Sequence, residues 1–261
     1  MTFMSWAEAL TLFAIGFVGS FISGMVGIGG SIIKYPMLLY IPPLLGVASY
    51  SAQEVAAVSA VQVFFATLAG VWAYRKDRYI HPKLVAYMGT AIIFGSFLGG
   101  FGSKFLDNAT INFVYAVLAA IAAVMMFIPR PEREARYEEV TFSKPIATLS
   151  AFVVGLLSGI VGAAGAFILI PIMLVVLNIP TRVAIASSMA ITFISSIGAT
   201  VGKVLTGHLL FWPAVIMVIA STLASPLGVR VAKRVKAKIL KGILAALILA
   251  TALKIWVDIL F

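Results

Sequence analysis

Cysteine is absent from this chain of 261 residues, which excludes disulfide bonds and thiolate metal sites. Histidine occurs only as His81 and His208, which are too far apart in the sequence to form a metal-ligand motif. The sequence also lacks the HExxH and GxSxG motifs and has no paired aspartates within its apolar stretches. We therefore expect no metal, no cofactor and no enzymatic activity.

Charged residues are scarce, at 11% of the chain against about 25% in soluble domains. Hydrophobic residues make up 62%, and the mean hydropathy is +1.11. The charges are clustered, so stretches such as residues 109–128 and 243–253 carry none. Apolar runs of about 18 residues or more are typical of membrane-spanning helices. The composition therefore predicts an all-α integral membrane protein that crosses the cell (cytoplasmic) membrane several times.

Acidic residues are outnumbered, with 9 Asp and Glu against 19 Lys and Arg, and the net charge is +10. The basic residues lie in short loops between apolar stretches, where membrane topology requires them, so we expect no nucleic-acid partner. Their charge favours contact with anionic membrane lipids and anionic solutes. Because the first basic residue is Lys34, the N-terminal apolar segment lacks the basic region of a cleaved signal peptide, and we expect it to be retained.

One glycine-rich element occurs twice in the chain. Residues 23–30 read SGMVGIGG and residues 158–165 read SGIVGAAG, and each is followed by a proline, Pro36 or Pro171, at the same offset of 135. Both copies interrupt strongly apolar sequence. Paired breaks of this kind, at matching positions in two halves, are the best sequence indication of a secondary transporter's binding site.

The duplication predicts two membrane repeats, residues 1–128 and 145–261, joined by a polar cytoplasmic linker at 129–144 that holds eight charges. Beyond the glycines the repeats match at offsets of 128 and 129: Ser59 with Ser187, Gly70 with Gly198, Arg75 with Lys203, Gly99 with Gly228 and Lys104 with Lys233. Each repeat is predicted to hold one broken segment and three spanning helices. The predicted segments are 7–26, 32–41, 51–74, 84–101 and 110–128 in the first repeat, and 145–161, 168–177, 183–204, 211–229 and 239–260 in the second.

The basic residues also predict how the repeats are oriented. If each broken segment enters and leaves the membrane on one side, each repeat crosses three times and the two repeats are inverted. Fifteen of the 19 Lys and Arg residues then face the cytoplasm, as the positive-inside rule requires, and both termini face outward. Four full spans per repeat would instead place six basic residues of the loop 230–241 outside. The charge pattern favours inverted repeats over eight ordinary helices in parallel repeats.

The glycine breaks are candidate anion sites. Glycine leaves a helix without steric cost, and the helix that starts after each break, near Ser31 or Ala166, has free N–H groups and a positive dipole end. Such an end binds anions when it points into the protein. The backbone around the breaks supplies the candidate substrate-binding residues Gly27, Gly29, Gly30 and Ser31, and Gly162, Gly165 and Ala166. The alternative is close helix packing through small residues.

Polar residues follow both breaks. Ser59 and Gln62 lie on the segment after the first break, and hydroxyl and amide groups can donate hydrogen bonds to an anion without carrying charge. Their counterparts after the second break are the candidate residues Ser187, Ser188 and Thr192. Lys34 lies four residues past the first break, where a lysine is costly unless it faces a cavity, and it is a candidate for the charge that holds an anion. Interhelical hydrogen bonding, or an ion pair at the membrane surface, would explain the same residues without a substrate.

In these features the chain resembles the TauE/SafE family of sulfite and organosulfonate exporters. The resemblance lies in the duplicated S-G-x-x-G element with its following proline, in the serine-bearing helix after each break, and in the helix-ending Arg75 and Lys203, and it covers essentially the whole chain. Members of the family are implicated in moving sulfur oxyanions or sulfonates across the cytoplasmic membrane. The resemblance implies a secondary transporter for sulfite, sulfoacetate or a related sulfonate, and we expect it to work by alternating access.

The chain departs from the family pattern at Ala163 and Ala164, where glycine is common, and at Lys34, where the residue is usually apolar. The substrate therefore stays open. An anion channel, a cation-coupled transporter of another small solute and a structural or assembly protein are the other functions that this sequence allows, and it is compatible with a homo-oligomer.

Overall fold

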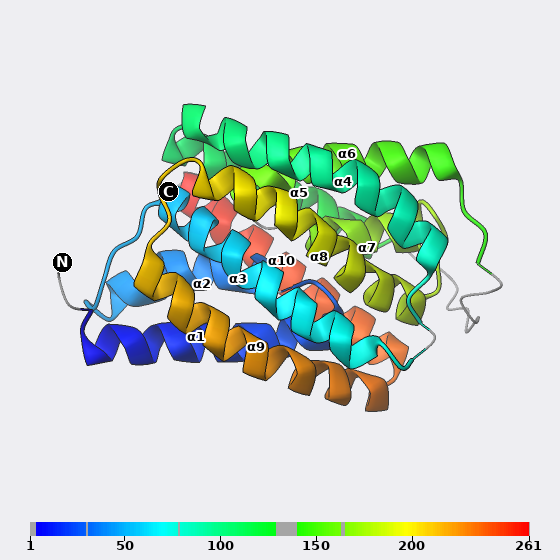
Figure 1. The fold of residues 1–261 in the computed structure, drawn as a ribbon, viewed down its shortest axis with the longest axis horizontal. Coiled ribbons are helices and arrows are strands. Elements are labelled where there is room, and N and C mark those ends of the chain that lie inside the picture. Colours follow the sequence, from blue (N-terminus) through cyan, green and yellow to red (C-terminus); the bar gives the residue numbers. More distant parts are fainter. Residues whose placement is uncertain (1–3, 30, 78, 129–139, 163–164, 261) are drawn as a thin grey trace.

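The structure of the protein is a computed structural model that describes residues 4–29, 31–77, 79–128, 140–162 and 165–260, and the only regular elements of these residues are helices (Figure 1). The helices of the first half are α1 (Trp6–Val26), α2 (Ser31–Leu44), α3 (Ala52–Tyr74), α4 (Pro82–Gly102), a short 3₁₀ helix η1 (Ser103–Phe105) and α5 (Asn108–Met126). Those of the second half are α6 (Lys144–Val161), α7 (Ala166–Val175), α8 (Thr181–Val204), α9 (Phe211–Arg234) and α10 (Ala237–Leu260). Each of the ten predicted segments corresponds to one of these α-helices, in the predicted order.

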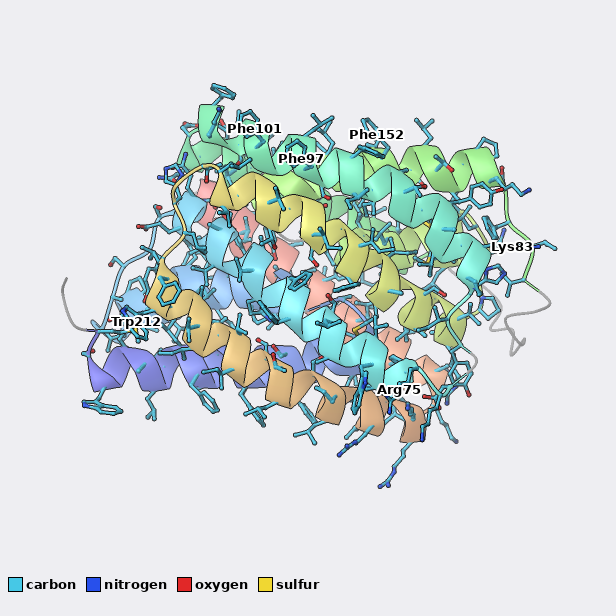
Figure 2. All side chains as sticks on the ribbon, viewed as in Figure 1. Arg75, Lys83, Phe97, Phe101, Phe152 and Trp212 are labelled. Carbon is cyan, nitrogen blue, oxygen red and sulfur yellow. The ribbon has the colours of Figure 1, made fainter. Side chains whose placement is uncertain are left out.

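Eight of the described helices are long and apolar enough to cross a membrane. The other two, α2 and α7, have 14 and 10 residues, fewer than the roughly 20 that a span needs. Large apolar side chains cover the outside of the bundle, as Phe97 and Phe152 do in Figure 2. The prediction of an all-α, multi-pass membrane protein is confirmed.

The starts of the helices are set by local sequence signals. Ser51 and Glu54 form a reciprocal capping box at the start of α3, and the side chain of Asp107 accepts the backbone N–H of Thr110 at the start of α5. At the start of α4, His81 Nδ1 accepts the backbone N–H of Leu84 over 3.0 Å. These bonds satisfy donors that helix formation leaves free, which matters most near lipid.

The two halves interlock through their first and third long helices. The most extensive helix contacts are between α1 and α9 and between α6 and α4, so each half packs against the other. A side chain at Gly228 would collide with the backbone carbonyl of Phe21, and one at Gly99 would collide with that of Leu156. Phe21 matches Leu156 at the offset of 135, and Gly99 matches Gly228 at the offset of 129, so the two close approaches are repeat counterparts. The glycines therefore let the helix backbones touch in both pairs.

The helices α4 and α9, which the repeat offset pairs, run in opposite directions. Figure 2 places Lys83, at the start of α4, and Arg75, at the end of α3, at one end of the bundle. It places Phe101, near the end of α4, and Trp212, at the start of α9, at the other end. The N and C marks of Figure 1 lie at this second end, which we call the terminal end; the end with Arg75 and Lys83 is the linker end, because α5 ends and α6 begins there.

Both glycine breaks form as predicted. Gly27 follows α1 with φ of 77°, and Gly162 follows α6 with φ of 75°, a conformation that glycine alone adopts without cost. In α2, Pro36 has no N–H to offer the carbonyl of Ile32, four residues earlier. The hydroxyl of Tyr115 donates to that carbonyl over 2.7 Å, which ties α2 to α5.

Candidate functional site

The first break lies between α3 and α8. A Cβ at Gly27 would meet the backbone carbonyl of Ile185, and the hydroxyl of Ser188 donates to the carbonyl of Gly27 over 2.8 Å. A Cβ at Gly29 would lie 2.8 Å from Thr67 Cγ2 and 3.1 Å from Thr192 Cγ2. The non-helical backbone is therefore enclosed by protein on two sides, as membrane-embedded backbone requires.

The second break lies against α3 and against its own preceding helix. A Cβ at Gly162 would meet the carbonyl of Ala56 in α3, the pseudo-equivalent of the contact between Gly27 and α8. A Cβ at Gly165 would meet Val154 and Ser158 of α6. Gly165 has φ of 76° and immediately precedes α7. Each break is thus held against the long helix that follows the break of the opposite half.

Four buried side chains form a polar cluster beside the first break. The Nζ of Lys34 donates to Ser20 Oγ over 2.9 Å and to the backbone carbonyl of Gly29 over 3.3 Å. Ser20 in turn donates to Ser221 Oγ over 2.7 Å and accepts from Gln62 Nε2 over 3.3 Å. Each side chain is 0% exposed. We call Lys34, Ser20, Gln62 and Ser221 the Lys34 cluster; they come from α2, α1, α3 and α9.

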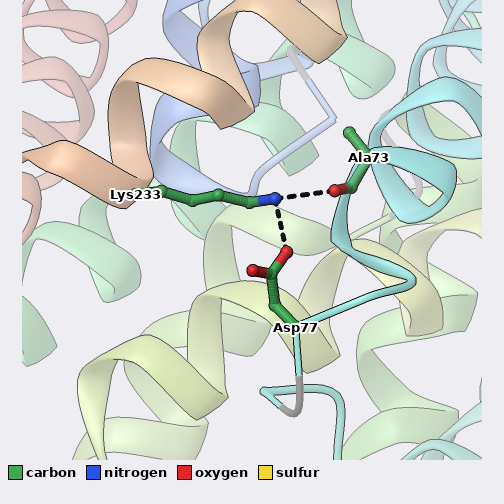
Figure 3. A network of polar contacts seen from close by, with 3 residues as sticks. All are labelled: Ala73, Asp77 and Lys233. Carbon is green, nitrogen blue, oxygen red and sulfur yellow. Dashed lines mark hydrogen bonds and ion pairs between the residues drawn. The ribbon is translucent and has the colours of Figure 1, made fainter.

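Lys34 has no carboxylate partner among the residues that the structure describes, whereas Lys233 is paired with Asp77 (Figure 3). Its two acceptors are a hydroxyl and a carbonyl, and neither carries charge. A buried ammonium group without an opposite charge costs several kcal/mol. An opposite charge beside Lys34 would remove this cost.

The space for the lysine is provided by a glycine. A Cβ at Gly19 would lie 2.9 Å from Lys34 Cδ and closer still to Cγ. The aliphatic stem of Lys34 thus lies directly on the backbone of α1. This contact holds the ammonium group in place beside Ser20.

Several buried polar atoms near the break are unpartnered within the described part of the chain. They include Gln62 Oε1, Ser59 Oγ, Thr192 Oγ1 and Ser195 Oγ. Buried polar atoms are almost always hydrogen-bonded in proteins, and those that are not call for an explanation such as a ligand. Gln62 belongs to the Lys34 cluster, and a Cβ at Gly29 would lie 3.1 Å from Thr192 Cγ2, so two of these atoms belong to residues beside the break.

The other predicted site residues are distributed differently. Ser187 is not in the Lys34 cluster, because its hydroxyl accepts the backbone N–H of His81 over 2.9 Å at the linker end. Ser188 is bound to the carbonyls of Gly27 and Ile185. Ser31 and Ala166 begin α2 and α7, as predicted. Gly30 lies outside the described residues.

Ser20 and Ser221 are cluster members that sequence reasoning missed. Ser20 lies three residues before the first repeated serine, on the buried side of α1, and Ser221 lies in the middle of α9. Their meeting depends on how α1 packs against α9, which is a property of the fold. The only signal in the sequence was that both are polar residues within apolar stretches.

Lys203 is a second buried lysine, but its environment is different. Its Nζ donates to the carbonyl of Ile160 over 2.6 Å and to Ser103 Oγ over 2.7 Å. Because Ile160 lies in the last turn of α6, Lys203 satisfies a free carbonyl at a negative helix end. This arrangement is structural, and it distinguishes Lys203 from Lys34.

Comparison with known proteins identifies the family. The sequence profile of the family described as "Sulfite exporter TauE/SafE" matches residues 12–255. The chain belongs to the TauE/SafE family. A relative from Bacillus subtilis (strain 168), "Probable membrane transporter protein YunE", is 24% identical over 246 residues, which cover 87% of this chain and 89% of the relative.

A second relative, "Probable membrane transporter protein MJ0441" of Methanocaldococcus jannaschii, is 23% identical over 252 residues, 91% of each chain. A "Probable membrane transporter protein" of Xylella fastidiosa (strain Temecula1 / ATCC 700964) is 27% identical over 182 residues, which cover 69% of this chain and 67% of the relative. No solved structure matches the chain. Family membership and the eight candidate spans identify a multi-pass membrane transporter of the cell membrane.

Proposed function

We propose that this TauE/SafE protein is a secondary transporter for a small sulfur oxyanion or organosulfonate, such as sulfite or sulfoacetate, and that the anion binds at the Lys34 cluster. The observation that carries the proposal is the full burial of the Lys34 ammonium group beside uncharged acceptors. An anionic substrate would supply the missing opposite charge. No catalytic step is involved.

The cluster offers the donors that an oxyanion needs. Lys34 would provide charge, and the hydroxyls of Ser20 and Ser221 would reorient their hydrogen atoms toward substrate oxygens. The amide of Gln62 is held by Ser20 through its nitrogen, so binding would exchange one weak bond for a charge-assisted one. The start of α2 adds partial positive charge three residues before Lys34.

Alternating access would follow from the arrangement of the two halves. The repeat-related helices α4 and α9 run in opposite directions, and each half packs on the other, α1 on α9 and α6 on α4. This relation supports inverted repeats with three full crossings each, and with the hairpins α1–α2 and α6–α7 entering from opposite sides. Rocking of one half against the other would expose the Lys34 cluster to the two sides in turn.

The test is uptake of radiolabelled sulfoacetate into liposomes that contain the purified protein. Uptake should saturate, which separates a transporter from an anion channel, and sulfite should compete with it. Replacing Na⁺ by K⁺ tests the cation-coupled alternative.

A matched pair of variants connects uptake to the site. Lys34→Met keeps the volume of the side chain without its charge, so it should fold as stably as the wild type and lose uptake. Lys254→Met removes an exposed lysine that lies 4.4 Å from the ring centre of Tyr40, and it should keep uptake. Equal uptake in both variants, or no uptake of any anion by the wild type, would refute the proposed function.

A further inference from the structure

A cleft opens at the terminal end of the bundle between α2, α3 and α9. It is small and is lined by Leu38, Tyr50, Glu54, Val55, Val58 and Pro213. Glu54 is the charged residue of this lining, and it accepts two hydrogen bonds from Ser51 as part of the cap of α3. Its charge is thereby directed at the helix start.

The helices that line the cleft also carry the Lys34 cluster. Leu38 lies four residues, about 6 Å along the helix axis, from Lys34 in α2, and Val58 lies the same distance from Gln62 in α3. In α9, Pro213 lies eight residues, about 12 Å, from Ser221. Three helices therefore lead from the cleft to the cluster.

A thin apolar layer separates the cleft from the cluster. Leu38 is 1% exposed and Val58 is 3% exposed. Met217, one turn from both Pro213 and Ser221, is 0% exposed. Ser59, next to Val58 in α3, has a buried hydroxyl with no partner in the described chain.

At the linker end, α3 and α9 are bound to each other instead. Lys233, near the end of α9, pairs with Asp77 and donates to the backbone carbonyl of Ala73 over 2.8 Å (Figure 3). The repeat counterparts of this pair at the terminal end are Lys104 and Leu205, which cannot form an ion pair. The terminal end is held instead by the bonds of Lys203 to Ser103 and Ile160, which involve no opposite charge.

We propose that the cleft is the entrance through which the anion reaches Lys34 from the side of the membrane on which the N-terminus lies. Leu38, Val58 and Met217 form the gate that must part, and the contact of Lys233 with Asp77 keeps the linker end closed meanwhile. This inference rests on the proposed function, because it assigns the route to the same site.

The absence of cysteine makes the test direct, since one introduced thiol is the only one in the chain. Leu38→Cys places it in the gate. Met173→Cys, at the repeat counterpart of Leu38 in α7 and likewise buried, is the matched control. Both variants, in sealed vesicles of known orientation, are treated with a membrane-impermeant maleimide on the side of the N-terminus. Val58→Cys serves as a second gate variant if Leu38→Cys does not fold.

We expect the maleimide to label the gate thiol and to leave Met173→Cys unmodified. Sulfoacetate at a hundred times its Kd should slow the labelling about 100-fold, because it leaves about 1% of the sites unoccupied. Gate thiols that are unreactive, or that sulfoacetate does not protect, would overturn the entrance. The proposed function would still stand if uptake depends on Lys34; if uptake does not depend on Lys34, the proposed function falls whatever the labelling shows.

Discussion

Replacing Gly19 by alanine should displace Lys34 without removing any polar group of the site. The new methyl group would lie 2.9 Å from Lys34 Cδ and closer to Cγ, whereas carbon atoms in contact are about 3.5–4.0 Å apart. The lysine stem must therefore retreat by about 1 Å. The bond from Nζ to the carbonyl of Gly29, already 3.3 Å long, would be lost.

The size of the effect on binding follows from Coulomb's law. Two unit charges 4 Å apart attract by about 4 kcal/mol at an effective dielectric constant of about 20, and by about 3.3 kcal/mol at 5 Å. A retreat of about 1 Å thus weakens anion binding by about 0.8 kcal/mol, or about fourfold in Kd. Overpacking should also lower the free energy of unfolding by about 1–3 kcal/mol.

The assay is isothermal titration of sulfoacetate into the purified protein, with unfolding in denaturant measured alongside. Gly242→Ala is the control, because no described atom outside the local helix backbone and its chain neighbours lies within 4 Å of the position where its methyl group would be. It should leave Kd unchanged and should not destabilise α10, since alanine favours a helix over glycine. If Gly19→Ala binds as tightly as the wild type and is equally stable, the confinement of Lys34 by Gly19 is wrong.

Three further predictions concern the framework around the site. Gly27→Ala and Gly162→Ala should each lower the free energy of unfolding by at least about 1–2 kcal/mol, because both residues have positive φ and touch the backbone of another helix. Thermal unfolding measures this loss, and variants as stable as the wild type would contradict the described conformation of the breaks. Lys233→Met should change the free energy of unfolding by no more than about 1 kcal/mol, because the pair with Asp77 is partly exposed. It should raise the maleimide reactivity of a cysteine introduced at the linker end, and unchanged reactivity would contradict the role of Lys233 in closing that end. Burial lowers the pKa of His81 from its usual value of about 6.5, so as the pH falls the unfolded chain binds the proton before the folded chain does. The neutral, buried His81 therefore contributes fully to the free energy of unfolding above about pH 6.5, and this contribution is lost as the pH falls through the lowered pKa. His81→Asn keeps a capping group and should flatten the decline in stability between about pH 7 and 5, and an unchanged decline would exclude His81 as its source.

The elements of the fold could be predicted from the sequence because their signals are local. Apolar runs located the long helices, and the repeated glycines located both breaks, at Gly27 and Gly162, where the chain takes positive φ. Lys34 stood out because a lysine so close to a break in an apolar stretch requires a special environment. The division into two repeats was likewise a prediction from the duplication.

The composition of the site could not be predicted in the same way, because it depends on how helices cross. Ser221 meets Ser20 only because α1 packs on a helix of the other half. Ser187 has the sequence context of a site residue, but the crossing of α8 brings it to the backbone of His81 instead. A polar residue within an apolar run signals burial; its partner is decided by the tertiary packing.

The packing of α1, in the first half, on α9, in the second half, has a consequence for biosynthesis. From Val26, where α1 ends, to Phe211, where α9 begins, the ribosome must add 185 residues. At about 5–20 residues per second this takes about 10–40 seconds, during which the face of α1 that packs on α9 lacks this partner. The first half therefore waits in the bilayer for the second, and neither half encoded as a separate gene fragment should be stable until both are produced together.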